Sequence, residues 1–214
     1  FVFDTPVLYF GFRDTVEKYQ ETSRKNGFTE ETVGCPIIIS NEEIEVKSRY
    51  LSKLKLAKKL YEADGLIVLS HFKGHDLSNF GGAIKNLGMG GLTKEGKTIM
   101  HRETKPANFS RALTEAASFF VKKFDKKILY INVLLDITKH CDCVGDLGEI
   151  VAPNIGILIS DNIVVVEKAS LDLVQKATNN AFGSMFKPKL DEQIISAIDF
   201  GLGKEEYELK NLNK

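Results

Sequence analysis

Residues 66–75 read L-I-V-L-S-H-F-K-G-H, an apolar run that passes directly into polar and basic residues. The run from Leu66 to Leu69 is continuously apolar, which is typical of a short strand buried on both faces. In open α/β sheets, ligands bind beyond the carboxyl ends of such strands. We therefore expect a functional site to begin at Ser70.

Short apolar runs alternate with helical patterns along the rest of the chain. The other runs cover Phe1–Phe3, Pro36–Ile39, Lys127–Leu135, Ile155–Ile159 and Ile163–Val166. Helical patterns cover Glu17–Lys25, Val46–Ala63, Asn108–Phe124, Ala169–Ala177 and Leu190–Phe200. Strands separated by helices indicate parallel pairing. The sequence predicts an α/β fold with a layered, mostly parallel sheet flanked by helices.

The composition excludes several classes of protein. The chain has 214 residues, 43% of them hydrophobic, with 29 basic and 29 acidic side chains. A chain of this size buries roughly 70% of its unfolded surface, so we expect a single α/β unit over residues 1–214. The balanced charge lacks the electrostatic footprint of nucleic-acid binding. No apolar run approaches the roughly 18 residues of a membrane span, so we expect neither nucleic-acid nor membrane partners.

The cysteine content and the first residues carry two further expectations. Three cysteines are too few for a disulfide framework, and no secretory signal is evident, which favours a cytoplasmic protein. The chain begins at Phe1, inside a strand pattern and without an initiator methionine. We expect it to be the core of a longer chain that lacks its N-terminal segment.

The glycine-rich passage from Ser70 to His101 holds most of the chemically capable residues. It contains three of the four histidines, which supply imidazoles for proton transfer or metal binding. A loop followed by a short helix is expected at Phe80-Gly81-Gly82, where free backbone amides would face an anion. A lone histidine or lysine is more often structural, but clustering favours a functional site. The candidates are His71, His75, Gly81, Gly82, Lys85, Asn86 and His101.

One motif in this passage has the spelling of a phosphate-binding loop. Residues 91–98 read G-L-T-K-E-G-K-T, in which Lys97 would pair with phosphates. A true phosphate loop joins a buried strand to a helix, whereas the preceding N-L-G-M-G does not read as a strand. The context therefore argues against nucleotide hydrolysis.

A second chemically interesting segment is His140-Cys141-Asp142-Cys143. Two thiolates and an imidazole are soft ligands that suit zinc, iron or copper, although joint binding by Cys141 and Cys143 requires a turn. Buried, reduced thiols are the alternative. Cys35 reads as a small core residue.

Motifs along nearly the whole chain resemble the uncharacterised iron–sulfur-centre proteins, a family with a domain of unknown function. They are Phe3-Asp4-Thr5, Asn26-Gly27-Phe28, residues 70–75, residues 80–90, residues 141–143, Asn154 to Leu158 and Gly201-Leu202-Gly203. Many relatives carry ferredoxin-type cysteine clusters after the position of His101, whereas residues 102–125 here contain no cysteine. We expect no four-iron cluster within this chain, because three thiols are one too few.

The central motif is also distantly similar to the nickel-pincer lactate racemases. Lys85 lies ten residues after His75 and sixteen before His101, which fits that family's arrangement. The resemblance implies that His75 transfers protons, that Lys85 anchors the cofactor covalently and that His101 binds the metal. The family's second catalytic histidine has no counterpart, since Phe12 stands before Arg13 here.

Two functional hypotheses follow. The first is an enzyme of isomerase or oxidoreductase type that acts on a small organic acid with an anionic cofactor or a divalent metal such as nickel, iron or zinc. His75 and His71 would be catalytic, Lys85, Gly81, Gly82 and Asn86 would hold the cofactor, and His101 would bind metal. The second is a redox or metal-binding protein that uses Cys141 and Cys143 with a ferredoxin-like partner. The first requires Lys85, His75 and His101 to line one pocket.

Overall fold

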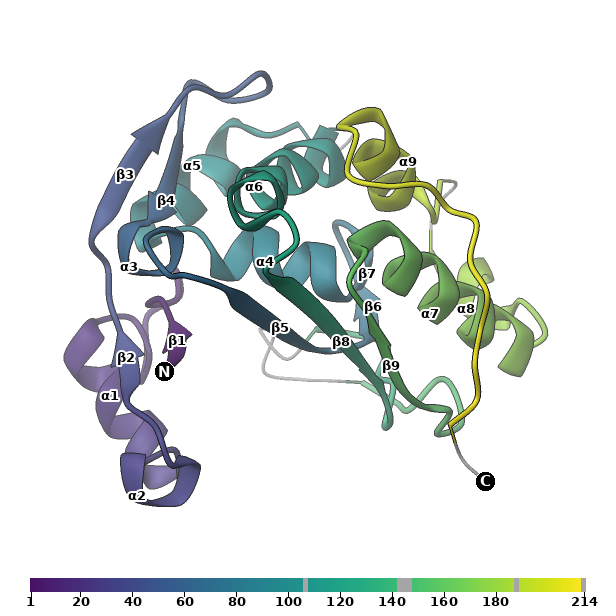
Figure 1. The fold of residues 1–214 in the computed structure, drawn as a ribbon, viewed down its shortest axis with the longest axis horizontal. Coiled ribbons are helices and arrows are strands. Elements are labelled where there is room, and N and C mark those ends of the chain that lie inside the picture. Colours follow the sequence, from purple (N-terminus) through teal and green to yellow (C-terminus); the bar gives the residue numbers. More distant parts are fainter. Residues whose placement is uncertain (106–107, 142–147, 187–188, 213–214) are drawn as a thin grey trace.

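The computed structural model describes residues 1–105, 108–141, 148–186 and 189–212, and mixes helices with small sheets (Figure 1). The α/β class is therefore confirmed. The strand pairings are mixed: the paired strands β1–β2 and β5–β8 are parallel, while β3–β4, β6–β7 and β8–β9 are antiparallel. The expectation of a mostly parallel sheet is not confirmed. No helix in the described ranges has the length and apolarity needed to cross a bilayer.

The N-terminal elements gather at one end of the molecule, on the left in Figure 1. Strand β1 (Val2–Asp4) pairs with β2 (Ile37–Ile39), and helices α1 (Val16–Lys25) and α2 (Glu30–Val33) lie between them in the chain. The Thr15 side chain caps α1 by accepting a hydrogen bond from the Lys18 amide. The two strands and α1 agree with the predicted ranges to within a residue.

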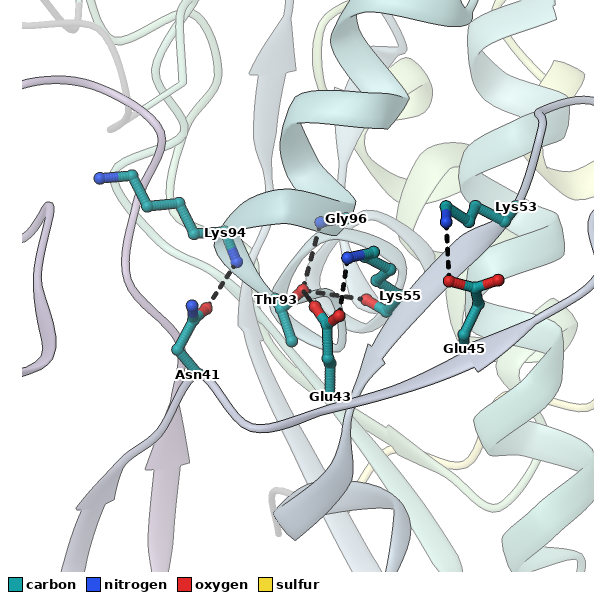
Figure 2. A network of polar contacts seen from close by, with 8 residues as sticks. All are labelled: Asn41, Glu43, Glu45, Lys53, Lys55, Thr93, Lys94 and Gly96. Atoms are coloured by element: carbon teal, nitrogen blue, oxygen red, sulfur yellow. Dashed lines mark hydrogen bonds and ion pairs between the residues drawn. The ribbon is translucent and has the colours of Figure 1, made fainter.

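A hairpin replaces the helix predicted over Val46–Ala63. It consists of β3 (Glu43–Val46) and β4 (Leu54–Ala57), and only Lys58–Tyr61 forms a short helix, α3. Leu54 and Leu56 are fully buried while Lys55 between them reaches Glu43, so the apolar period is two residues. The helical spacing of Tyr50 and Tyr61 within this range is therefore coincidental. The cross-strand pairs Lys55–Glu43 (2.6 Å) and Lys53–Glu45 (2.8 Å) add to the hairpin (Figure 2).

The central sheet has the strand order β5–β8–β9, formed by Leu66–His71, Ile128–Leu134 and Gly156–Ser160. Helices α4 (Ala83–Gly90) and α7 (Ile163–Ala177) cover one face, above the sheet in Figure 1, and α6 (Phe109–Phe124) packs on α4. Alternate residues of β8, from Ile128 to Leu134, are buried on that face and join the main core.

The opposite face of this sheet is apolar and open to solvent. Ile67 and Leu69 of β5 are 65% and 62% exposed, and Ile157 and Ile159 of β9 are 59% and 60% exposed. Ile131 of β8 lies between Leu69 and Ile159 in the strand register. The strands are thus apolar on both sides, but among the described residues helices cover only one side, so the predicted burial on both faces is not observed.

The residues predicted as a last strand, Ile163–Val166, instead begin helix α7. Asn162 caps this helix, since its side-chain oxygen accepts hydrogen bonds from the amides of Val164 and Val165. Ile163, Val164 and Val166 are buried against the core. Burial of the first turn therefore outweighs the β-propensity of its branched side chains.

The remaining elements lie around the carboxyl end of β5 or at the C-terminus. They are the hairpin of β6 (Lys73–His75) and β7 (Asn79–Gly81), and helices α5 (Lys94–Glu103), α8 (Ala181–Ser184) and α9 (Glu192–Asp199). Helix α9 packs against α6 and α7.

Candidate functional site

A cavity of about 340 Å³ lies at the carboxyl end of β5, where the sequence places the functional site. Its lining residues are Asp4, Val7, Leu8, Tyr9, Arg13, Leu69, Ser70, His71, Lys73, His75, Gly81, Gly82, Lys85, Asn86, Met89, Gly90, Lys97, His101 and Cys141. Every candidate from the glycine-rich passage is among them. Cys141 joins them from beyond β8, while Cys143 lies outside the described residues.

His71 is the last residue of β5, and its ring is tied to the chain beyond β8. The Nε2 atom lies 2.6 Å from the carbonyl oxygen of Leu135. A carbonyl can only accept, so Nε2 must carry a proton. In the neutral ring this leaves Nδ1 with a free lone pair, which makes His71 a proton acceptor.

His75 ends strand β6 and is fixed in the opposite tautomer. Its Nδ1 atom accepts hydrogen bonds from the amides of Leu77 (3.3 Å) and Ser78 (3.2 Å). The Ser78 hydroxyl lies 2.9 Å from the same atom. Because backbone amides can only donate, Nδ1 is unprotonated and the proton is on Nε2. His75 is therefore a hydrogen-bond donor toward a ligand.

His101 extends from α5, and Phe109 of α6 positions its ring. The Phe109 ring centre lies 5.5 Å from that of His101 and 6.4 Å from that of His75. Burial lowers the pKa of His101 below its usual value, and the positive charge of Lys85 acts in the same direction. At neutral pH His101 is accordingly an uncharged imidazole that can accept a proton or a metal ion.

Helix α4 carries Lys85 and Asn86 into the cavity wall. The Lys85 ammonium donates a hydrogen bond to the Cys141 sulfur over 3.4 Å, which joins the two candidate segments in one place. Asn86 also has a structural role. Its side-chain amide donates to the Leu69 carbonyl (2.9 Å), and the same nitrogen lies 3.0 Å from the Ser70 hydroxyl. Asn86 thus ties α4 to the end of β5.

The amides at the start of α4 are not free for an anionic ligand, contrary to the sequence-based expectation. The Glu167 carboxylate of α7 accepts hydrogen bonds from the amides of Ala83 and Ile84. Asn132 donates to the same oxygen over 3.2 Å. Gly82 permits this contact, since a Cβ atom there would collide with the carboxylate. The protein thus supplies its own carboxyl group to this helix terminus.

Lys97 belongs to α5 and not to a phosphate-binding loop. Thr93 caps that helix by accepting from the Gly96 amide (3.2 Å), and the Lys94 amide donates to Asn41 (2.8 Å; Figure 2). The Lys97 ammonium donates to the Thr5 hydroxyl (2.6 Å), the Thr5 carbonyl (3.2 Å) and the Pro6 carbonyl (2.9 Å). Its three protons are therefore used to hold the segment after β1, and the phosphate-loop spelling is fortuitous.

The cavity is locally positive although the chain as a whole is neutral. Arg13, Lys73, Lys85 and Lys97 line it, whereas Asp4 is the single carboxylate among the described lining residues. Burial lowers the pKa of Lys97 to about 8, and Lys85 and Arg13 lower it as well. Asp4 acts in the opposite direction. This arrangement favours an anionic ligand, which would relieve the repulsion among the cations.

A protein-family model described as a domain of unknown function (DUF362) matches residues 1–172. The chain is a DUF362 protein. The matched range includes every cavity residue and Glu167, and leaves out α8 and α9. No curated protein and no solved structure matches the chain. The iron–sulfur and lactate racemase resemblances extend beyond this family match, so what they imply stays a prediction.

The described part of this DUF362 chain does not present a ready metal site. No group of three or more histidine, cysteine, aspartate or glutamate side chains is placed to hold one ion within the described residues. Cys141 is in the cavity, but its predicted co-ligand Cys143 is not described, and Cys35 lies before β2. We therefore derive no chemical step through a metal.

Sequence reasoning missed several residues that shape the DUF362 site. The sequence analysis assigned no role to Arg13, which follows Phe12. Arg13 lines the cavity, whereas Phe12 is 84% exposed. Phe109 and Glu167 carry no local motif, because they come from helices that approach the glycine-rich loop only in three dimensions. Glu167 lies between the strand predicted over Ile163–Val166 and the helix predicted over Ala169–Ala177, so no sequence pattern singled it out.

Proposed function

We propose that this DUF362 protein is an enzyme that acts on a small organic acid, with proton transfer at the cavity beyond β5. The observation that carries the proposal is the fixing of His71 and His75 in complementary tautomers beside a cluster of cations. A site that offers one proton acceptor and one hydrogen-bond donor suits reactions next to a carboxylate, of isomerase or oxidoreductase type.

The roles of the residues follow from their hydrogen bonds. Arg13 and Lys85 pair with the carboxylate, because both line the cavity with a positive charge. His71 takes a proton from the substrate at Nδ1, and the Leu135 carbonyl stabilises the resulting imidazolium through Nε2. His75 donates a hydrogen bond from Nε2 to the substrate oxygen on which charge develops. A neutral imidazole in that position polarises the oxygen without losing its proton.

A cofactor would find its partners in the same wall. Lys85 is the amine placed to hold an anionic group or to form a covalent link, next to Gly81, Gly82 and Asn86. Glu167 already occupies the amides of Ala83 and Ile84, so the side-chain cations and not the helix terminus would bind the anion. Intact-mass measurement of the purified protein tests for a covalent adduct on Lys85.

Substitutions that keep the hydrogen-bonding function of one ring nitrogen, and remove that of the other nitrogen, test the proposed roles. His71→Gln preserves a donor toward Leu135 and removes the base, and His75→Asn preserves an acceptor toward Ser78 and removes the donor. His140→Gln is the matched control, since His140 pairs with Asp76 and is not among the cavity residues.

The assay follows exchange of the C2 proton of 2-hydroxy acids, and of the C3 protons of 2-oxo acids, in deuterated water by NMR. We expect turnover by the unmodified protein and the control, and a loss of roughly 10²- to 10⁴-fold in each site variant. Absence of binding and exchange for every acid tested would overturn the proposal. Equal exchange by the wild type and the His71→Gln variant would reject His71 as the base.

A further inference from the structure

The cavity wall contains two kinds of surface, and the proposed chemistry uses only one of them. The cations and imidazoles come from β5, β6, α4 and α5 and from Arg13, whereas Val7, Leu8 and Met89 add apolar side chains. The volume of about 340 Å³ lies within the range of pockets that enclose drug-sized ligands. A two- or three-carbon acid would leave the apolar part of this wall in contact with water.

Val7 and Leu8 of the apolar wall belong to a defined loop, residues 7–13, whose two ends are joined. The Val7 amide donates to the Arg13 carbonyl over 2.9 Å, and the Thr22 hydroxyl donates to the Phe12 carbonyl over 2.7 Å. The Lys94 ammonium holds the following residue by donating to the Asp14 carbonyl over 2.6 Å. These bonds fix the loop against α1 and α5, so its side chains form a preformed surface.

Side chains of this loop divide between the cavity and solvent. Val7 and Leu8 line the cavity together with Arg13, which places a cation at the end of an apolar patch. Phe10 and Phe12 are 94% and 84% exposed and are not among the lining residues. The same loop therefore provides apolar residues that would contact a ligand, Val7 and Leu8, and apolar control residues that would not, Phe10 and Phe12.

We infer that the acid bound here carries an apolar body, aromatic or branched aliphatic, which packs against Val7, Leu8 and Met89 while its carboxylate pairs with the cations. This inference rests on the proposed function and specifies its substrate class. Burial of each methylene against such a wall is worth roughly a fourfold gain in affinity. Loop 7–13 is thus the element that determines specificity.

A carboxylate series tests the inference by calorimetry. Acetate, butyrate, hexanoate and phenylacetate share a headgroup and differ in their apolar bodies. We expect affinity to rise about fourfold per methylene that enters the cavity. Leu8→Ser and Met89→Gln, on separate elements, should each flatten this rise, whereas Phe10→Ser should retain it. Thermal unfolding of each variant verifies that it is folded.

The possible results separate this inference from the proposed function. Affinity that is the same for all four acids and falls in Lys85→Met would overturn the apolar-body inference and retain an acid-binding site. A tail-dependent rise that Leu8→Ser and Met89→Gln leave unchanged would also overturn it, because the tail would then bind elsewhere. Failure of every acid to bind would count against the proposed function itself.

Discussion

At the scale of single residues, the adjacent glycines Gly81 and Gly82 differ in how strictly their surroundings require a glycine. A Cβ atom at Gly82 would collide with the buried Glu167 carboxylate, whereas one at Gly81 would meet only the flexible Lys85 side chain, at 3.5 Å. The first position is therefore constrained by a close approach of α7 and the second is not. Both positions line the cavity, so they form a natural pair for comparison.

We expect Gly82→Ala to lower the free energy of unfolding by about 1–3 kcal/mol, the cost of forcing a methyl group into a packed site. Gly81→Ala should change it by less than about 1 kcal/mol, because the added methyl group would make only ordinary van der Waals contacts with Lys85. Chemical denaturation of both variants gives the comparison. Equal stability of the two variants would contradict the proposed contact with Glu167.

Glu167 makes stability depend on pH. Burial raises its pKa to about 7, although the hydrogen bonds from Asn132, Ala83 and Ile84 act in the opposite direction. Its Oε2 atom is buried without a hydrogen-bond partner among the described residues, which favours the protonated acid. The folded state therefore holds this proton more tightly than the unfolded state does.

Stability from this group is fully present below about pH 4.5 and is lost as pH rises through about 7. We expect the free energy of unfolding of the wild type to fall by an amount on the order of 3 kcal/mol between pH 5 and pH 8 because of this group. This fall should be absent in Glu167→Gln. Urea unfolding at the two pH values measures it. The same pH dependence in both proteins would show that Glu167 does not titrate in this range.

At the scale of elements, helix α5 joins the N-terminal elements to the cavity. Its buried Lys97 donates to Thr5 and Pro6, directly after β1, and its His101 lines the cavity one turn further along the helix. Gly96 lets the helix approach β4, since a Cβ atom there would collide with the Lys55 carbonyl. The residues that resemble a phosphate-binding motif are thus explained by packing.

We expect Lys97→Met to lower the free energy of unfolding by about 1–3 kcal/mol, because it leaves buried oxygen atoms without donors. Hydrogen exchange should increase most in β1 and the segment after it. Lys176→Met, on α7 and away from the cavity residues, is the control and should behave like the wild type. Unchanged protection of residues 1–6 in Lys97→Met would refute the anchoring role.

At the scale of the whole molecule, an open apolar face and a positive cavity coexist in a chain without net charge. The central sheet leaves Ile67, Ile157 and Ile159 largely exposed, next to Leu69. A contiguous apolar surface of this kind is unusual for a monomeric protein. It should bind hydrophobic fluorescent dyes in the folded state.

We expect Ile67→Lys combined with Ile159→Lys to reduce dye fluorescence several-fold, because two charges interrupt the apolar surface. Lys176→Met is again a suitable control. The circular dichroism of the double variant should stay that of the wild type, since both side chains are already about 60% exposed. Undiminished fluorescence in a folded double variant would locate the dye elsewhere.

Sequence patterns predicted β5 and β8, whose apolar runs are nearly continuous, and α6, whose apolar residues recur at helical spacing. They failed where tertiary contacts decide between alternatives. Residues 46–63 satisfy a helical period, but antiparallel pairing with β3 makes residues 54–57 the second strand of a hairpin. Residues 163–166 favour a strand, but the Asn162 cap and burial against the core make them helical.

The sequence by itself determined the α/β class and predicted a site after β5, and its candidates are eight of the nineteen described residues that line the cavity there. Local composition carries this information, because apolar runs and glycine-rich loops have few alternative structures. Only the tertiary structure decided the tautomers of His71 and His75, the capping of α4 by Glu167 and the presence of Arg13 and Phe109. Those features depend on atoms from segments far apart in the chain, whose proximity no local pattern encodes.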